Sequence, residues 1–122
     1  MAIVSSHVLD SVIGTHASGI RVACYRRTSD GRNSPVFDVT ATEEGRISET
    51  VSAQTGEEYE LVFHSADYYS TMSLPDDGYQ VLKTIAIRIE MPDPQAKYHL
   101  PIMLSPHSYS VWWSGKPPAS NT

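Results

Sequence analysis

Apolar and polar residues alternate along most of this chain, a pattern typical of β-strands with one buried face. Ile20, Val22 and Cys24 form one such apolar face, and Leu61 and Phe63 belong to another. The alternation and the turn signals between segments predict strands over residues 3–9, 20–25, 35–42, 49–53, 58–64, 80–91, 99–105 and 107–113. Seven or eight strands of this kind favour a two-sheet antiparallel sandwich of the all-β class.

Turn and cap residues add detail to this prediction. Gly45 closes a tight turn over residues 43–46, where glycine can adopt a positive φ. Pro101 suits an edge or the start of a strand, because proline lacks an N–H donor. Ser65 is placed to cap one short helix over residues 66–69. We expect one domain over residues 1–113 and a mobile tail over residues 114–122.

Composition narrows the class of protein. The 122 residues are 40% hydrophobic and 19% charged, as in a globular domain. The net charge of −5 argues against a nucleic-acid partner, and no apolar run approaches a membrane span. The start resembles no signal peptide, so we expect a cytoplasmic protein. Cys24, the single cysteine, cannot form an intrachain disulfide and is expected to be a small core residue.

Five histidines raise the question of acid–base chemistry, because imidazole titrates near neutral pH. His7 and His99 lie on predicted strands at opposite ends of the chain. His16, His64 and His107 carry no further signal, and we expect them to be structural. The spacings match no compact zinc pattern, so we expect neither a metal nor a cofactor. Arg46, directly after the Gly45 turn, is suited to hold a carbonyl or an anion.

The last predicted strand carries two adjacent tryptophans, Trp112 and Trp113. Neighbouring strand residues point to opposite faces, so one indole is expected in the core. The other then faces solvent, a pocket or a partner, and indicates a binding surface. The serines nearby have no G-x-S-x-G elbow, which argues against a serine hydrolase.

Two segments resemble a known family. They are His7-Val8-Leu9-Asp10-Ser11-Val12-Ile13-Gly14 and Tyr98-His99-Leu100-Pro101-Ile102-Met103-Leu104-Ser105-Pro106. Gly19-Ile20-Arg21-Val22, Glu44-Gly45-Arg46 and Tyr59-Glu60-Leu61-Val62-Phe63 add to the likeness. Together, over about residues 3–113, the chain resembles the transthyretin and 5-hydroxyisourate hydrolase family.

This resemblance implies a prealbumin-like sandwich of two four-stranded sheets with one short helix. It also implies a homotetramer, a dimer of dimers with sites in a channel between the dimers. The hydrolases open the ring of 5-hydroxyisourate with water, whereas transthyretin carries thyroid hormone in that channel. By motif, the residues of the hydrolases fall on His7, Arg46 and His99. Transthyretins lack this set, so the resemblance favours an enzyme without a cofactor over a carrier.

The C-terminal end departs from the hydrolase pattern. Hydrolases end in Tyr-Arg-Gly-Ser, whereas the same register here reads Trp112-Trp113-Ser114-Gly115. Ser114 stands one position before the place of the hydrolases' terminal serine. We expect this shift of one residue to turn its side chain to the other face of the strand. Polar groups for a purine derivative are thus replaced by indole surface, which suits stacking and apolar contact.

These residues lead to one hypothesis and two alternatives. The first is a repurposed enzyme that cyclises, isomerises, eliminates or hydrolyses a larger, more apolar cyclic metabolite. His7 and His99 would move protons, Arg46 would steady a developing oxyanion, and Trp112, Trp113 and Ser114 would contact the substrate. The alternatives are a genuine 5-hydroxyisourate hydrolase of urate breakdown and a non-catalytic binder like transthyretin.

Overall fold

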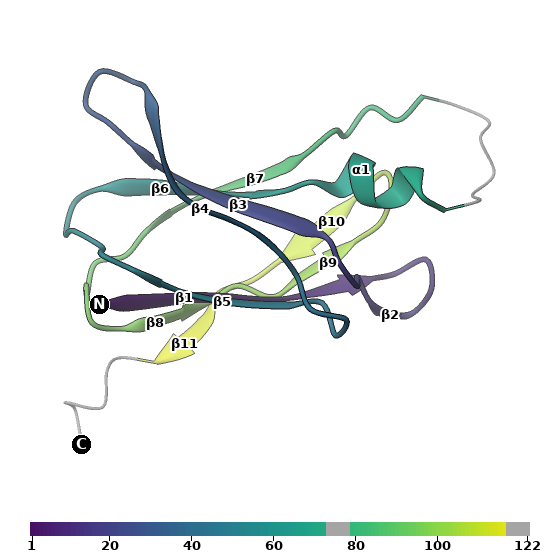
Figure 1. Cartoon of the computed structure of the whole chain (residues 1–122), viewed down its shortest axis with the longest axis horizontal. Coiled ribbons are helices and arrows are strands. Elements are labelled where there is room, and N and C mark those ends of the chain that lie inside the picture. The colour runs from purple at the N-terminus through teal and green to yellow at the C-terminus, as the bar shows by residue number, and fades with distance from the viewer. Residues whose placement is uncertain (73–78, 117–122) are drawn as a thin grey trace.

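Two β-sheets packed face to face make up the chain, and the computed structural model describes residues 1–72 and 79–116 (Figure 1). The first sheet consists of β1 (Ala2–Asp10), β2 (Thr15–His16), β5 (Arg46–Val51), β8 (Lys97–His99), β9 (Ile102–Leu104), β10 (Tyr109–Val111) and β11 (Ser114–Lys116). The second consists of β4 (Asn33–Thr40), β3 (Arg21–Arg27), β6 (Glu58–Phe63) and β7 (Ile85–Glu90), in that order across the sheet. The all-β sandwich predicted from the alternation is confirmed.

Strand β1 organises the first sheet because both of its edges are paired. β5 and β2 pair antiparallel with it, whereas β8 and β9 run parallel to it. β8 and β9 are two pieces of the single strand expected over residues 99–105, and the gap between them contains Pro101. Proline has no N–H to donate, which interrupts the ladder at this point. β10 and β11 then pair antiparallel with β9 and β8.

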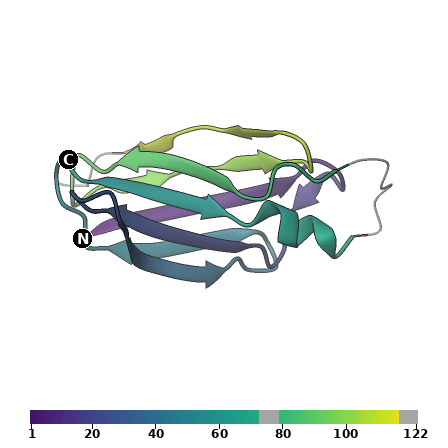
Figure 2. The ribbon, with the colours of Figure 1, turned by 90° about the horizontal axis from the view of Figure 1, so that it is seen from above.

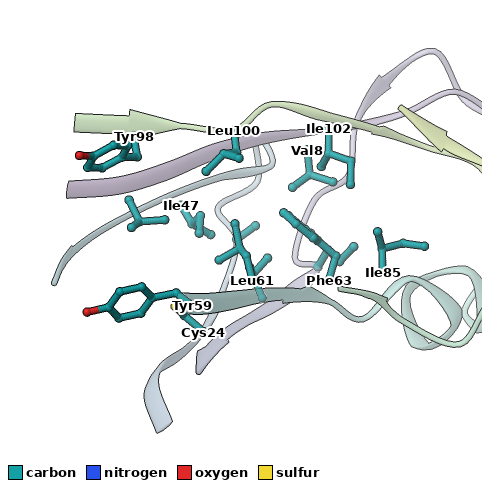
Figure 3. Close-up of a cluster of buried hydrophobic side chains, with 14 of the residues drawn as sticks. Val8, Cys24, Ile47, Tyr59, Leu61, Phe63, Ile85, Tyr98, Leu100 and Ile102 are labelled. Atoms are coloured by element: carbon teal, nitrogen blue, oxygen red, sulfur yellow. The ribbon is translucent and has the colours of Figure 1, made fainter. Parts of the chain in front are cut away.

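The core lies between the sheets, where side chains from both layers point toward one another (Figure 3). Burial alternates along β1, so that Val4, Ser6 and Val8 are enclosed and Ser5 and His7 between them face outward. Leu61 and Phe63 on β6 approach from the opposite sheet. Cys24 is fully buried among them, as its place in an alternating strand predicts. Burial also raises the pKa of its thiol to about 12.

Helix α1 (Ser65–Ser70) lies at the end of the sandwich where β2 lies (Figures 1 and 2). The prediction that Ser65 caps it is wrong: His64 occupies the N-cap, and no side chain makes a cap hydrogen bond. Ser65 Oγ is instead buried without a partner among the described residues. No helix in the described ranges is both long and apolar enough to cross a membrane.

The buried carboxylate of Asp10 fastens α1 to the first sheet. Its two oxygens accept hydrogen bonds from the hydroxyls of Tyr68 (2.7 Å) and Tyr69 (2.9 Å). The Val12 N–H donates to the same carboxylate at 2.9 Å. Burial and the Asp10 charge raise the pKa of both tyrosines, which keeps them protonated as donors. The carboxylate is thus buried with its hydrogen bonds satisfied, as buried charge requires.

The strands differ from the prediction in number and at their ends. Among the described residues they form sheets of seven and four strands, and not two four-stranded sheets, because β2 is added and the C-terminal strands are divided into short pieces. The strand expected over residues 80–91 begins only at Ile85, because its partner β6 ends at Phe63, opposite Ile85. The strand expected over residues 107–113 is shortened to β10, and a further strand, β11, takes up Ser114–Lys116, which are expected from the sequence to belong to the tail. The remaining tail, residues 117–122, lies outside the described residues.

Gly45 fits a site that leaves no room for a side chain. Its φ is 71°, in the left-handed region that glycine tolerates best. A Cβ at this position would overlap the carbonyl oxygen of Val8 and lie 3.1 Å from the nitrogen of Ala17. Gly45 therefore allows the turn before β5 to close against β1, which sets the position of Arg46.

We expect Gly45→Ala to destabilise the fold in two ways. The left-handed conformation costs about 1 to 2 kcal/mol, and overlap with backbone adds roughly 1 to 3 kcal/mol. Gly56→Ala is the matched control, because Gly56 has a φ of 87° but a Cβ added there would have no neighbour within 4 Å. Urea unfolding should show a clearly larger loss at position 45. Equal losses in the two variants would contradict the overlap with Val8.

Candidate active site

The outward face of β1 gathers the residues with the strongest acid–base signal. His7 pairs with Arg46 on β5, and Ser5 pairs with His99 on β8. Residues paired across strands project from the same face of a sheet. The pairing therefore brings His7, Arg46 and His99 together, although the two histidines lie near opposite ends of the sequence. The grouping of these three residues agrees with the expectation from the family motifs.

Each histidine has one side chain as a hydrogen-bond partner on this face. Ser5 Oγ lies 2.8 Å from Nδ1 of His99, which fixes the orientation of that ring. Nε2 of His7 lies 2.9 Å from Nδ1 of His16, with ring centroids 5.1 Å apart. Both imidazoles are thus held in place before any ligand binds, as an active site requires.

The surroundings favour the neutral form of both histidines. Partial burial and then the Arg46 charge lower the pKa of His7, and His16 and His99 act in the same direction. A backbone hydrogen bond to Glu44 partly opposes this. Partial burial and Arg46 also lower the pKa of His99, against a backbone hydrogen bond to Ser5. Near pH 7 each ring is therefore a neutral imidazole with a lone pair able to accept a proton.

A pocket of about 420 Å³ opens beside these residues. Arg46, His99, Ser5 and Ser48 line one side of it, and residues 39–42, at the end of β4 and the start of the following turn, contribute Val39, Thr40 and Thr42. Its volume is in the range of small-molecule sites. Glu49 also lines the pocket, whereas His7 lies outside its lining. A guanidinium, an imidazole, a carboxylate and several hydroxyls in one pocket suit a small polar ring.

The structure places Ser114 and the two tryptophans differently from the prediction. Ser114 pairs with His99, so it shares the face of His99 rather than the opposite one. Val111 pairs with Ile102 and Ser114 pairs with His99, so the chain keeps one register from β10 to β11. Trp112 and Ser114 are two residues apart and therefore lie on the same face. The Trp112 N–H donates to the Pro101 carbonyl at 3.2 Å.

Trp113 lies on the other face, with its ring edge-on to Tyr98 at 6.4 Å. The expectation that one indole is in the core is wrong, because Trp112 and Trp113 are 46% and 57% exposed. The final strand is at the edge of the first sheet, where no further strand among the described residues covers it.

Two residues of this site are not singled out by any sequence motif. Ser5 is two positions before His7 on an alternating strand, which already places it on the same face. His16 follows the turn at Gly14, and pairing of Leu9 with His16 returns it to that face. His64 is the N-cap residue of α1, and His107 lies in the turn between β9 and β10, so neither belongs to this face. Within residues 1–72 and 79–116, no three metal-ligating side chains gather.

The lowered pKa values of His7 and His99 predict that acid destabilises the fold. In the unfolded chain each ring binds a proton near pH 6.5, whereas in the folded chain each resists protonation to lower pH. The unfolded state therefore binds more protons below about pH 7, so stability falls as the pH drops toward 5. His7→Gln and His99→Gln should each flatten this slope in urea titrations at several pH values. Wild-type slopes in both variants would contradict the shifts.

With this geometry established, similarity to known proteins identifies the family. The HIUase/Transthyretin family model matches residues 4–113. 5-Hydroxyisourate hydrolase 2 of Rhizobium meliloti (strain 1021) is 34% identical over 114 residues, which cover 88% of this chain and 92% of that protein.

Two solved structures share the fold, each with a TM-score of 0.77 over 93% of this chain. An (S)-allantoin synthase is 24% identical, and the match spans 43% of its chain. Sea bream transthyretin in complex with thyroxine is 19% identical, and the match spans 95% of its chain. The family match covers most of the chain, and the fold and the hydrolase relative agree with it. This chain belongs to the HIUase/transthyretin family.

Proposed function

We propose that this chain is a 5-hydroxyisourate hydrolase, a cofactor-independent enzyme that opens a small polar ring with water. The observation that carries the proposal is the pairing of β1 with β5 and β8, which gathers His7, Arg46 and His99 on one face. The hydrolase relative at 34% identity supports the same activity. The position of Ser114 opposite His99 adds a hydroxyl on this face despite the altered terminus.

Each residue has a role that its position allows. One neutral imidazole removes a proton from the attacking water, and the imidazolium formed in this way returns a proton to the leaving ring nitrogen. The other imidazole holds the substrate by hydrogen bonds. Arg46, on β5 directly opposite His7, stabilises the negative charge that develops on the carbonyl oxygen. Ser5 orients His99 through the 2.8 Å hydrogen bond. The face is exposed in the single chain, and we propose that a homotetramer encloses it in a channel between dimers.

The test is the decay of 5-hydroxyisourate, generated from urate by urate oxidase and followed by ultraviolet absorbance. Sedimentation velocity should first show a tetramer. Wild-type protein should accelerate the decay, and His7→Gln and His99→Gln should each lower kcat/KM by about 100-fold or more. Arg46→Gln should lower it by roughly 100-fold. His107→Ala removes an exposed histidine outside the site, and its rate should match wild type. Folded wild-type protein that gives no acceleration would refute the hydrolase assignment.

Trp112 favours a second candidate function. Its half-exposed indole shares the face of His99 and offers a stacking surface to an aromatic or apolar ring. In this alternative the same acid–base residues transform a larger, more apolar cyclic metabolite by ring closure, isomerisation, elimination or hydrolysis. The enzyme would then be a repurposed member of the family.

Fluorescence distinguishes this second candidate, with phthalimide as an apolar cyclic probe. Trp113→Phe leaves Trp112 as the only indole, and Trp112→Phe leaves Trp113 as its matched counterpart. If an apolar ring binds on the His99 face, phthalimide should quench the emission of Trp113→Phe much more than that of Trp112→Phe. Equal quenching of the two variants would count against an apolar site at Trp112.

A further inference from the structure

His16 reaches the face of His7 through the shortest strand of the first sheet. β2 contains only Thr15 and His16, and its pairing sets His16 opposite Leu9. Leu9 and His7 are two residues apart on β1 and point to the same side. His16 is therefore a diagonal neighbour of His7, and their ring nitrogens, Nδ1 and Nε2, approach to 2.9 Å.

This contact determines where the proton of His7 is held. A neutral imidazole has one N–H donor and one lone pair, so a bond between two rings uses a donor of one and a lone pair of the other. The backbone of Glu44 raises the pKa of His7, which is the effect of a carbonyl near a ring N–H. We therefore assign the hydrogen of neutral His7 to Nδ1, because Nε2 is already engaged with His16. Its Nε2 is then the lone pair, and His16 donates to it.

The basic nitrogen of His7 consequently points at His16 and not at the pocket. Among the described residues, Nε2 of His16 has no protein hydrogen-bond partner and is not enclosed. We propose that His16 and His7 form a two-imidazole proton relay, in which Nε2 of His16 exchanges the proton with the reacting water. This inference rests on the proposed function, and it adds a residue to the acid–base machinery.

The relay balances in protons and in bonds. As the water oxygen bonds to the ring carbonyl carbon, its proton passes to Nε2 of His16. The Nδ1 proton of His16 moves at the same time to Nε2 of His7, which becomes an imidazolium. When the carbon–nitrogen bond of the substrate breaks, the same protons move back, and the leaving nitrogen receives one. His7 and His16 return to their starting states.

The groups around His7 make its imidazolium form short-lived. Arg46 on β5, His99 on β8 and His16 on β2 all oppose a positive charge on His7. The backbone of Glu44 acts in the opposite direction and raises the pKa of His7. The proton is therefore accepted only while the reaction supplies it, and it is released readily in the second half of the reaction.

Two substitutions at His16 separate a relay from a purely positioning role. Asn at position 16 can place its amide N–H near the position of the histidine Nδ1, so His16→Asn can keep the hydrogen bond to His7 but cannot pass a proton. His16→Ala loses both. For a relay, kcat on 5-hydroxyisourate should fall by about 100-fold in both variants. Wild-type kcat in His16→Asn, or in His16→Ala, would overturn the relay.

A second readout does not depend on any substrate. Nitrogen-15 spectra of the imidazoles should show His7 as a single tautomer with the proton on Nδ1, in wild type and in His16→Asn. In His16→Ala the tautomers should mix, and the midpoint of the His7 titration should rise because a donor to its lone pair is lost. A proton on Nε2 of His7 in the wild type would refute the relay. If the wild type does not hydrolyse 5-hydroxyisourate, these spectra still decide the question, and only the proposed function fails.

Discussion

The paired edges of β1 are the constraint on which the rest of the structure depends. With β5 on one edge and β8 and β9 on the other, neither face of this strand can rotate relative to its neighbours. Its inward residues complete the core, and its outward residues carry the candidate site. Core packing and site geometry are therefore set by a single register, because a slip by one residue would exchange the two faces.

Much of the fold could be predicted from the sequence, because alternation of apolar residues is a local property. β1, β3 and β6 fall close to their expected bounds for this reason. Errors occur where distant partners decide. β7 starts late because β6 ends opposite Ile85, and the N-cap of α1 moves from Ser65 to His64. Residues 114–116 form a strand because β8 offers a free edge, which no local pattern reveals.

The candidate site shows the same division between local and distant information. His7, Arg46 and His99 could be named from family motifs, but their meeting depends on long-range pairing. His16 has no distinguishing sequence signal, because its contact with the His7 ring is visible only once the hairpin register is known. The prediction that Ser114 faces away from the site is wrong, because the register of β11 against β8 depends on pairing with a distant strand.

Gly115 illustrates how close packing of the last strand restricts the residues that this terminus can contain. A Cβ there would lie 2.6 Å from the Lys97 carbonyl oxygen and 3.2 Å from the Trp113 ring. The hydrolase pattern has serine in this register, so serine and the present backbone are incompatible. Any side chain at position 115 therefore requires the backbone of β11 to move away from β8, so the contact between these two strands selects for glycine at this position.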